Sequence, residues 1–202
     1  GDAKTPPYII VNKDKQQKLF VFPPGFGGAE SYLNNIAKKI TEKSLILFNN
    51  YYLDLANKLG EETAAILSFE SLAKMYICNI KALQPQGPYN FFGWSFGGVL
   101  AFEVSKQLIE NNDRVDNLVL LDSFFSYSKA MRYIGRSIDQ ESQINYLYNP
   151  KICEHFKDTS ITMIKAQEPI GDGNAIYKYY SSNTQYNHLD DFVSATSINV
   201  IK

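Results

Sequence analysis

The segment Tyr89–Gly98 constrains the fold most, because an aromatic and apolar run leads straight into Gly93-Trp94-Ser95-Phe96-Gly97. Apolar residues at helical spacing follow at once, over Val99–Ile109. A strand, a sharp turn and a helix in this order place the central serine of G-x-S-x-G above a sheet edge. Glycines on both sides let the strand and the helix approach without Cβ clashes. The pattern predicts a nucleophilic Ser95, although a bare Gly/Ser turn would also match it.

Short apolar strands alternate with helical patterns along the chain, which favours a mostly parallel sheet with helices on both faces. The run Val115–Leu121 is almost unbroken in apolar residues and is expected to be buried on both faces. The other expected strands are Tyr8–Val11, Leu19–Phe22, Leu45–Phe48, the strand before Ser95, Ile161–Ile164 and Ser197–Ile201. The expected helices are Ala29–Ile40, Ser71–Leu83 and the helix after Ser95, and the pattern of Tyr51–Leu67 is ambiguous.

Composition narrows the class of protein. The chain has 202 residues, 45% of them hydrophobic and 20% charged, which suits one globular domain with a sizeable core. Its net charge of −1 gives no electrostatic reason to expect a nucleic acid or an anionic membrane as partner. Two cysteines, Cys78 and Cys153, suggest no disulfide framework and fit a reducing compartment. Since neither a signal peptide nor a membrane-length apolar run is apparent, a cytoplasmic location is expected.

The region 124–158 fits the alternation of strands and helices least, because it is rich in polar and turn residues. Segments inserted after a sheet strand are where lids and binding loops occur. A plain long connection is the alternative, but long structureless loops are uncommon in compact domains. We therefore predict a lid over about 124–158. His155 falls within it and is expected to be a solvated residue.

Asp122 is the predicted catalytic acid. It ends the strand that contains Leu118–Leu121, so its carboxylate is expected at the carboxyl edge of the sheet. There it would hold an imidazole in the right tautomer, as in a Ser-Asp-His order of catalytic residues. An aspartate that merely caps the next segment is the alternative. Glu103 and Asp116 are the reserve candidates, and both are expected at solvated positions beside the sheet.

The developing oxyanion of an acyl transfer needs two backbone donors. One is expected to be the N–H of Phe96, the residue after the nucleophile. The other is expected from the loop after an earlier strand, here Pro23-Pro24-Gly25, in which Gly25 is the first residue with an N–H to donate. A simple turn at this Pro-Pro-Gly is the alternative.

At this point several runs resemble one family, the thioesterase domains that end nonribosomal peptide and polyketide synthetases. The runs are Leu19–Gly25, Leu83–Tyr89, Gly93–Glu103 and Val119–Ser123. The resemblance implies an α/β-hydrolase fold, with residues 1–202 as a single domain from a larger multidomain synthetase. It also implies release of an acyl or peptidyl chain from the phosphopantetheine thioester of a carrier protein, by hydrolysis or macrocyclisation. The carrier domain and the acyl substrate are the implied partners, and no metal or cofactor of the domain's own is expected.

Histidine is where the chain departs from that family, since only His155 and His188 are present. The family places its catalytic histidine after the last sheet strand, whereas His188 precedes the expected strand Ser197–Ile201. The resemblance therefore implies a catalytic histidine beyond Lys202 and a domain truncated at its C-terminus. His188 as the third catalytic residue is the alternative.

Three other functions stay open at the level of sequence. A stand-alone editing thioesterase would share the fold and the chemistry. A general esterase or lipase would prefer simple esters to carrier thioesters. A non-catalytic carrier-binding module would follow if the protein has no catalytic histidine.

Overall fold

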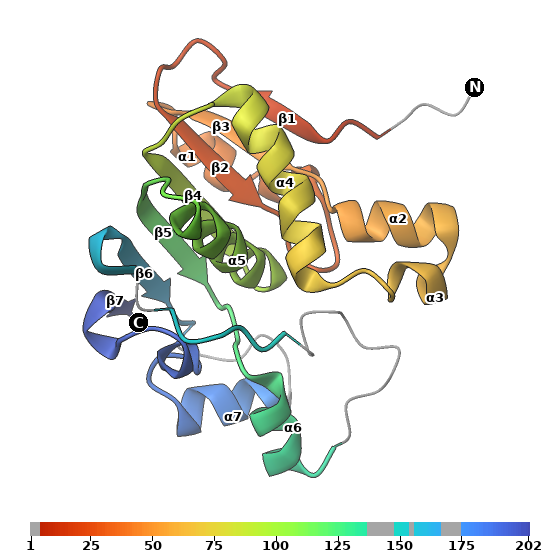
Figure 1. Cartoon of the computed structure of the whole chain (residues 1–202), viewed down its shortest axis with the longest axis vertical. Helices are drawn as coiled ribbons and strands as arrows, with labels where there is room; N and C mark the ends of the chain where they lie inside the picture. Colours follow the sequence, from red (N-terminus) through yellow and green to blue (C-terminus); the bar gives the residue numbers. More distant parts are fainter. Residues whose placement is uncertain (1–4, 137–147, 154–155, 167–174) are drawn as a thin grey trace.

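A single twisted sheet organises the chain (Figure 1). The computed structural model describes residues 5–136, 148–153, 156–166 and 175–202. Within them the strand order is β1-β3-β2-β4-β5-β6-β7. Strand β1 pairs antiparallel with β3 and the other neighbours are parallel, which confirms the predicted architecture. The strands are β1 Tyr8–Val11, β2 Lys18–Phe22, β3 Ser44–Phe48, β4 Tyr89–Trp94, β5 Val115–Leu121, β6 Ser160–Ile164 and β7 Ile198–Ile201.

The helices connect these strands and are mostly short. The α-helices are α1 Ile36–Lys39, α2 Tyr51–Leu59, α3 Glu61–Ala64, α4 Phe69–Leu83, α5 Phe96–Glu110, α6 Tyr127–Ile134 and α7 Ala175–Asn183. The 3₁₀ turns are η1 Ala29–Tyr32, η3 Phe156–Asp158, η4 Leu189–Asp191 and η5 Ala195–Ser197. No described helix has the length and apolar character needed to cross a membrane.

The single helix predicted over Ala29–Ile40 is wrong. The segment forms η1 and α1 with a break between them, at which the Asn35 side chain accepts a hydrogen bond from the Ile36 N–H (2.6 Å). Asparagine favours such caps over helix interiors, because its side chain competes for backbone groups. The ambiguous Tyr51–Leu67 contains two helices, and Gly60 separates them with φ of 87°.

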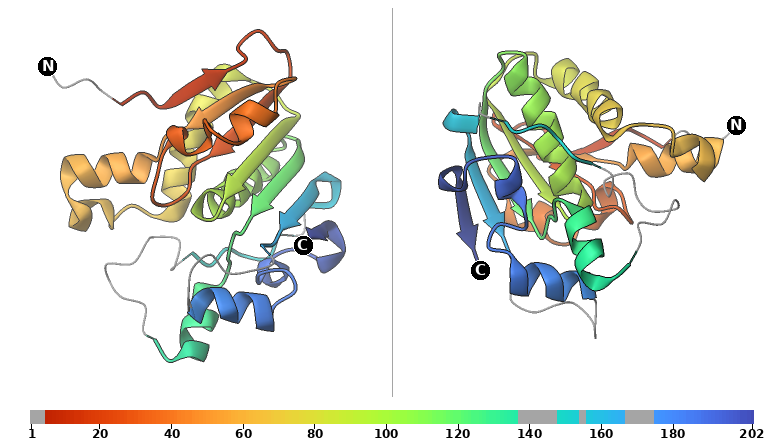
Figure 2. Two further views of the ribbon diagram at one scale, coloured as in Figure 1. Left: turned by 180° about the vertical axis from the view of Figure 1, so that it is seen from behind. Right: turned by 60° about the horizontal axis from the view of Figure 1, so that its bottom comes forward.

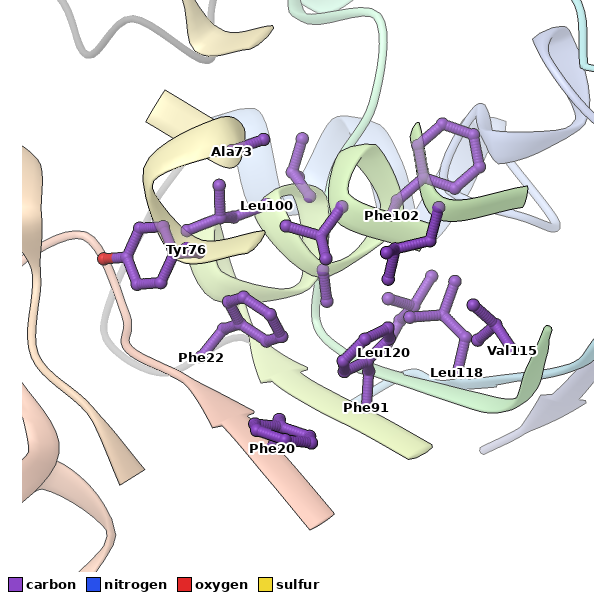
Figure 3. Packing of buried hydrophobic residues seen from close by; sticks show 14 of the residues in the cluster. Phe20, Phe22, Ala73, Tyr76, Phe91, Leu100, Phe102, Val115, Leu118 and Leu120 are labelled. Carbon is purple, nitrogen blue, oxygen red and sulfur yellow. The ribbon is translucent and has the colours of Figure 1, made fainter. Parts of the chain in front are cut away.

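The main core lies between the sheet and the pair α4 and α5, which cover one face (Figures 1 and 3). Phe20, Phe22 and Phe91 project from the strands toward Tyr76 of α4 and Leu100 of α5, and all five are fully buried. Phe22 and Phe91 pack edge to face with ring centroids 5.6 Å apart, and the Phe22 and Tyr76 rings are tilted with centroids 5.5 Å apart. This rigid layer holds α5, and therefore the turn before it, against the sheet.

The opposite face is covered less completely, so the expectation that Val115–Leu121 is buried on both faces is wrong. Leu118 and Leu120 are buried under α5, but Val119 and Leu121 are only half-buried and Asn117 is exposed. On this second face, η1 and α1 pack against β2 and β3 rather than β5 (Figure 2). Over Asn117–Leu121 the strand therefore shows a two-residue alternation of burial.

Glu103 is also not where we expected it, because it is fully buried rather than solvated. Its carboxylate accepts hydrogen bonds from the Tyr148 hydroxyl and from Gln107 Nε2 (2.9 Å), and Lys106 Nζ lies 3.6 Å away. Helix α5 is central in the fold, so Ser105 and Gln107 are also buried. Asp116 is partly exposed and pairs with Arg114 at 2.8 Å.

Helices α6 and α7 lie together beyond the carboxyl ends of the parallel strands (Figures 1 and 2). Helix α6 belongs to the region 124–158 predicted to form a lid. Residues 137–147 and 154–155 of that region lie outside the described residues, and so does His155. The lid stays a prediction.

Candidate active site

Ser95 occupies the turn between β4 and α5 with φ of 55° and ψ of −119°. A non-glycine residue rarely adopts positive φ, and such a conformation costs about 1–3 kcal/mol unless its surroundings hold it. The Ser95 N–H donates to the Leu121 carbonyl at the end of β5 (2.7 Å). The turn is therefore fixed to the neighbouring strand at the residue that carries the strain, as a nucleophile elbow requires.

Three glycines make this turn sterically possible. A Cβ on Gly93 would overlap the backbone of Gly97, the second residue of α5. A Cβ on Gly97 would lie 2.5 Å from the Pro23 carbonyl oxygen, and a Cβ on Gly98 would lie 2.8 Å from Ser123 Cβ. Real Cβ contacts essentially never fall below 3.0 Å. Strand β4, helix α5 and the loops after β2 and β5 therefore meet at a distance that only glycine allows.

Asp122 directly follows β5 and also has positive φ, 46°. Its N–H donates to the Ile164 carbonyl (3.0 Å), and its Oδ1 accepts from the Ala166 N–H (2.7 Å). Because the Ser95 N–H is hydrogen-bonded to the carbonyl of Leu121, the residue before Asp122, the fold brings Ser95 and Asp122 to the same edge of the sheet. Burial and interaction with the Asp122 carboxylate raise the pKa of Tyr177, whose ring stacks edge to face on Phe124.

The loop predicted to supply the second oxyanion donor lies against the start of α5. The close approach of Gly97 to the Phe22 and Pro23 carbonyls places this loop beside Phe96. Tyr32 joins the two segments, because its buried hydroxyl donates to the Phe22 carbonyl and accepts from the Trp94 N–H (3.3 Å). The Gly25 and Phe96 backbones thus belong to one connected unit, and their roles stay predictions.

Two asparagines that the sequence reasoning missed hold the same loop. Asn50 Nδ2 donates to the Pro24 carbonyl (3.1 Å), and Asn49 Oδ1 accepts from the Ala29 N–H (2.9 Å). Both asparagines are buried at the end of β3. Their position directly after a strand, where polar side chains of parallel sheets collect, was the available signal.

His188 contacts Tyr179 and Asp191 rather than the residues around Ser95. Its Nε2 is 2.7 Å from the Tyr179 hydroxyl of α7, and its Nδ1 is 4.0 Å from Asp191 Oδ2. Burial lowers the pKa of His188, and the opposing effect of Asp191 does not restore it. Asp191 itself is bonded to Lys129 Nζ and Ser126 Oγ at 2.7 and 2.8 Å. The described contacts of His188 therefore join it to α7 directly and to α6 through Asp191, not to Ser95 or Asp122.

His188, Asp190 and Asp191 are the described residues whose ligand atoms come close enough together to hold a metal ion, within 4.8 Å of one another. Lys129 already neutralises Asp191, and Asp190 is exposed. These contacts are those of a surface ion pair, and nothing in them calls for a metal.

The chain is similar to known proteins both in sequence and in fold. In sequence, the chain is 40% identical over 205 residues to N-(5-amino-5-carboxypentanoyl)-L-cysteinyl-D-valine synthase of Amycolatopsis lactamdurans. It is 37% identical over 209 residues to the synthase of the same name from Penicillium rubens. These alignments cover 96% and 98% of this chain but only 5% of each relative, so the chain corresponds to a small part of them.

In structure, the chain resembles the thioesterase domain of NocB from the nocardicin cluster, with a TM-score of 0.67 and 19% identity. The match covers 96% of this chain and 86% of that one. The surfactin thioesterase domain SrfTE gives a TM-score of 0.58 and 18% identity, over 96% and 83%. At such identities the likeness concerns the fold, and it confirms the predicted α/β-hydrolase class.

A family model described as thioesterase domain matches residues 17–169. That span runs from β2 through the Ser95 turn and Asp122 to the end of β6. The chain therefore belongs to the thioesterase domain family.

Proposed function

We propose that this domain releases a peptidyl chain from a carrier protein by way of an acyl-Ser95 intermediate. The observation that carries the proposal is the strained backbone of Ser95, held by the Leu121 carbonyl at the carboxyl edge of the sheet. Ser126 has the φ and ψ of an ordinary left-handed turn, 51° and 52°, whereas Ser95 combines φ of 55° with ψ of −119°, and such a sharp turn raises the hydroxyl of a nucleophile above the sheet.

In the first step, Ser95 Oγ attacks the thioester carbonyl carbon and its proton passes to a histidine. The Gly25 and Phe96 N–H groups stabilise the oxyanion, each donor being worth about 3 kcal/mol of barrier. The C–S bond then breaks, and the carrier thiol leaves with the proton from the histidine. A thiolate is a good leaving group, so the oxyanion donors matter more here than protonation of the leaving group.

In the second step, the histidine takes a proton from water, and the resulting hydroxide attacks the acyl carbon of acyl-Ser95. The ester C–O bond breaks, Ser95 regains its proton, and the chain leaves as a free acid. Asp122 holds the imidazole in the required tautomer and stabilises its charged form. An attacking amine or hydroxyl of the chain itself would give a cyclic product instead.

Two candidates exist for the histidine: His188, and a histidine elsewhere in the full-length protein. The contacts of His188 with Tyr179 and Asp191 favour the second candidate. We therefore assign the proton transfer to a histidine other than His188, and the position of that histidine stays a prediction.

The relatives named for a cysteinyl-valine product suggest the substrate. We infer that the natural substrate is a short peptide, bound through its C-terminal residue to the carrier thiol. A product with a free carboxylate calls for hydrolysis rather than cyclisation. The implied protein partner is the carrier domain of the same synthetase.

The experiment uses the full-length protein and a synthetic tripeptidyl-pantetheine thioester ending in valine. We expect a product one water heavier than the cyclic peptide, and a fluorophosphonate adduct on Ser95 by intact-mass and peptide analysis. Ser95→Ala should abolish both. An ethyl ester of the same peptide, which is not activated, serves as comparison: faster turnover of that ester would identify a general esterase. Release that survives Ser95→Ala would overturn the mechanism.

A further inference from the structure

Beyond the proposed catalytic residues, two buried polar side chains connect the strained turn at Ser95 to the segment after Asp122. Ser123 is fully buried, and its Oγ donates to the Ser95 carbonyl at 2.9 Å. Leu121 accepts the N–H of Ser95 from the other side. Both backbone ends of the nucleophile are therefore hydrogen-bonded to the three residues Leu121–Ser123, the middle one of which is Asp122, and the Ser95 carbonyl also accepts from the Gly98 N–H of α5 (3.0 Å).

The fit around Ser123 is close. Helix α5 has a glycine, Gly98, where any side chain would overlap the Ser123 hydroxyl. The Ser123 hydroxyl therefore occupies the space that the missing side chain of Gly98 leaves beside the first turn of α5. The acceptor of this hydroxyl is the carbonyl of Ser95, whose φ is unfavourable. The hydrogen bond therefore stabilises the backbone conformation that the nucleophile needs.

Asn187 holds Ser123 in turn. The Asn187 Nδ2 donates to the Ser123 carbonyl (3.1 Å), and the backbone carbonyl of Asn187 accepts from the Phe125 N–H (3.0 Å). Asn187 is fully buried and has φ of 50°, a conformation that asparagine tolerates better than most residues. The two bonds clamp the turn after β5 from both sides. The segment 186–192, far away in sequence, thus reaches the catalytic edge through Asn187 rather than through His188.

We propose that Ser123 and Asn187 are positioning residues, which hold Ser95 and Asp122 in the geometry for acyl transfer. The inference rests on the proposed function. Neither side chain touches the reacting atoms: Ser123 acts on the Ser95 backbone, and Asn187 acts on Ser123. Losing either hydrogen bond lets the Ser95 turn relax toward ordinary dihedral angles, which moves the hydroxyl away from Asp122 and from the oxyanion donors.

The chain supplies a matched control for each residue. Ser105 is another fully buried serine, and its Oγ donates to the Ala101 carbonyl (2.7 Å) further along α5. Asn12 is another asparagine with positive φ, 57°, and its Nδ2 donates to the Ile40 and Lys43 carbonyls far from the site. Each control loses the same chemical groups as its counterpart but lies away from the catalytic edge.

The test compares Ser123→Ala with Ser105→Ala, and Asn187→Gly with Asn12→Gly, in the full-length protein. Glycine keeps the left-handed backbone open while removing the amide. The readout is the turnover of tripeptidyl-pantetheine per active site, with sites counted by fluorophosphonate titration, because that rate does not depend on how much protein is folded. We expect kcat per site to fall about tenfold for Ser123→Ala and for Asn187→Gly, with KM unchanged. The controls should keep the wild-type rate.

A double variant tests whether Ser123 and Asn187 act through one shared effect on the Ser95 turn or through two independent effects. If both residues act through the Ser95 turn, Ser123→Ala and Asn187→Gly together should lower kcat little more than either alone. Site variants as active per site as their controls would overturn the inference, provided that Ser95→Ala is inactive. Turnover in Ser95→Ala would instead refute the proposed function itself.

Discussion

Gly97→Ala is the substitution whose effect the structure specifies most sharply. The added Cβ would lie 2.5 Å from the Pro23 carbonyl oxygen and closer still to that of Phe22. Both are backbone atoms of the end of β2 and the loop that follows, and Tyr32 holds this loop to the Trp94 N–H. Contact at 3.0 Å, the lower limit of real Cβ contacts, requires a separation of about half an ångström.

That displacement acts on the two proposed oxyanion donors, since Phe96 sits on α5 and Gly25 on the loop. Donors must reach the oxyanion within about 2.7–3.1 Å, so half an ångström removes most of one hydrogen bond. We expect kcat to fall about 10²–10³-fold, as for loss of one donor, with KM little changed. Overpacking against backbone should also cost about 3 kcal/mol of stability, which lowers Tm by roughly 6–12 °C.

Gly27→Ala in the same loop is the control. Its Cβ would meet the Ser31 hydroxyl, the end of a half-buried side chain that can rotate away. We expect near-wild-type turnover and Tm for this variant. The assays are single-turnover release from the pantetheine thioester, below the Tm of each variant, and differential scanning calorimetry. If Gly97→Ala kept wild-type kcat, the close approach of the loop to α5 would not be what assembles the oxyanion site.

Three further outcomes are expected. Asp122→Asn keeps the acceptor for the Ala166 N–H but favours the wrong imidazole tautomer, so turnover should fall about 10⁴-fold with an unchanged Tm; near-normal turnover would place the acid elsewhere. Because burial lowers the folded-state pKa of His188 below 6.5, the wild type should lose stability relative to His188→Gln as pH falls from 7 through that pKa. Urea titrations at pH 7 and 5 measure this difference, and equal pH dependence would contradict it. Tyr148→Phe removes a donor to the buried Glu103 carboxylate and should cost about 1–3 kcal/mol in urea unfolding, whereas a neutral effect would mean that water replaces the phenol.

Local patterns were enough to predict the framework of the sheet. Tyr8–Val11 and Val115–Leu121 form strands with the predicted bounds, and Ser71–Leu83 lies within α4. These segments are decided by short-range features: apolar runs of strand length, a helical repeat, and punctuating glycines and prolines. In Ala29–Ile40 the apolar repeat predicted one helix, but the Asn35 cap divides the segment into η1 and α1, which pack against β2 and β3.

Burial of polar groups was beyond the reach of sequence patterns. Glu103 looked like a solvated helix position, and it is covered because Tyr148, 45 residues further along, packs on α5 and donates to it. The same holds for Tyr32, Asn49 and Asn50 around the oxyanion loop. Partners distant in sequence decide whether a polar residue is solvated or bonded in the core.

The sequence by itself determined which groups could carry the chemistry. A serine between glycines and an aspartate after a buried strand are local patterns, and each states the backbone environment that its residue needs. Only the tertiary structure decided how these groups are held together. Leu121 and Ser123 grip the Ser95 backbone, Asn187 secures the turn that contains Asp122, and His188 is directed to Tyr179 and Asp191. The physical reason is that hydrogen bonds across a sheet edge depend on the register and crossing of distant segments, which no local spacing encodes.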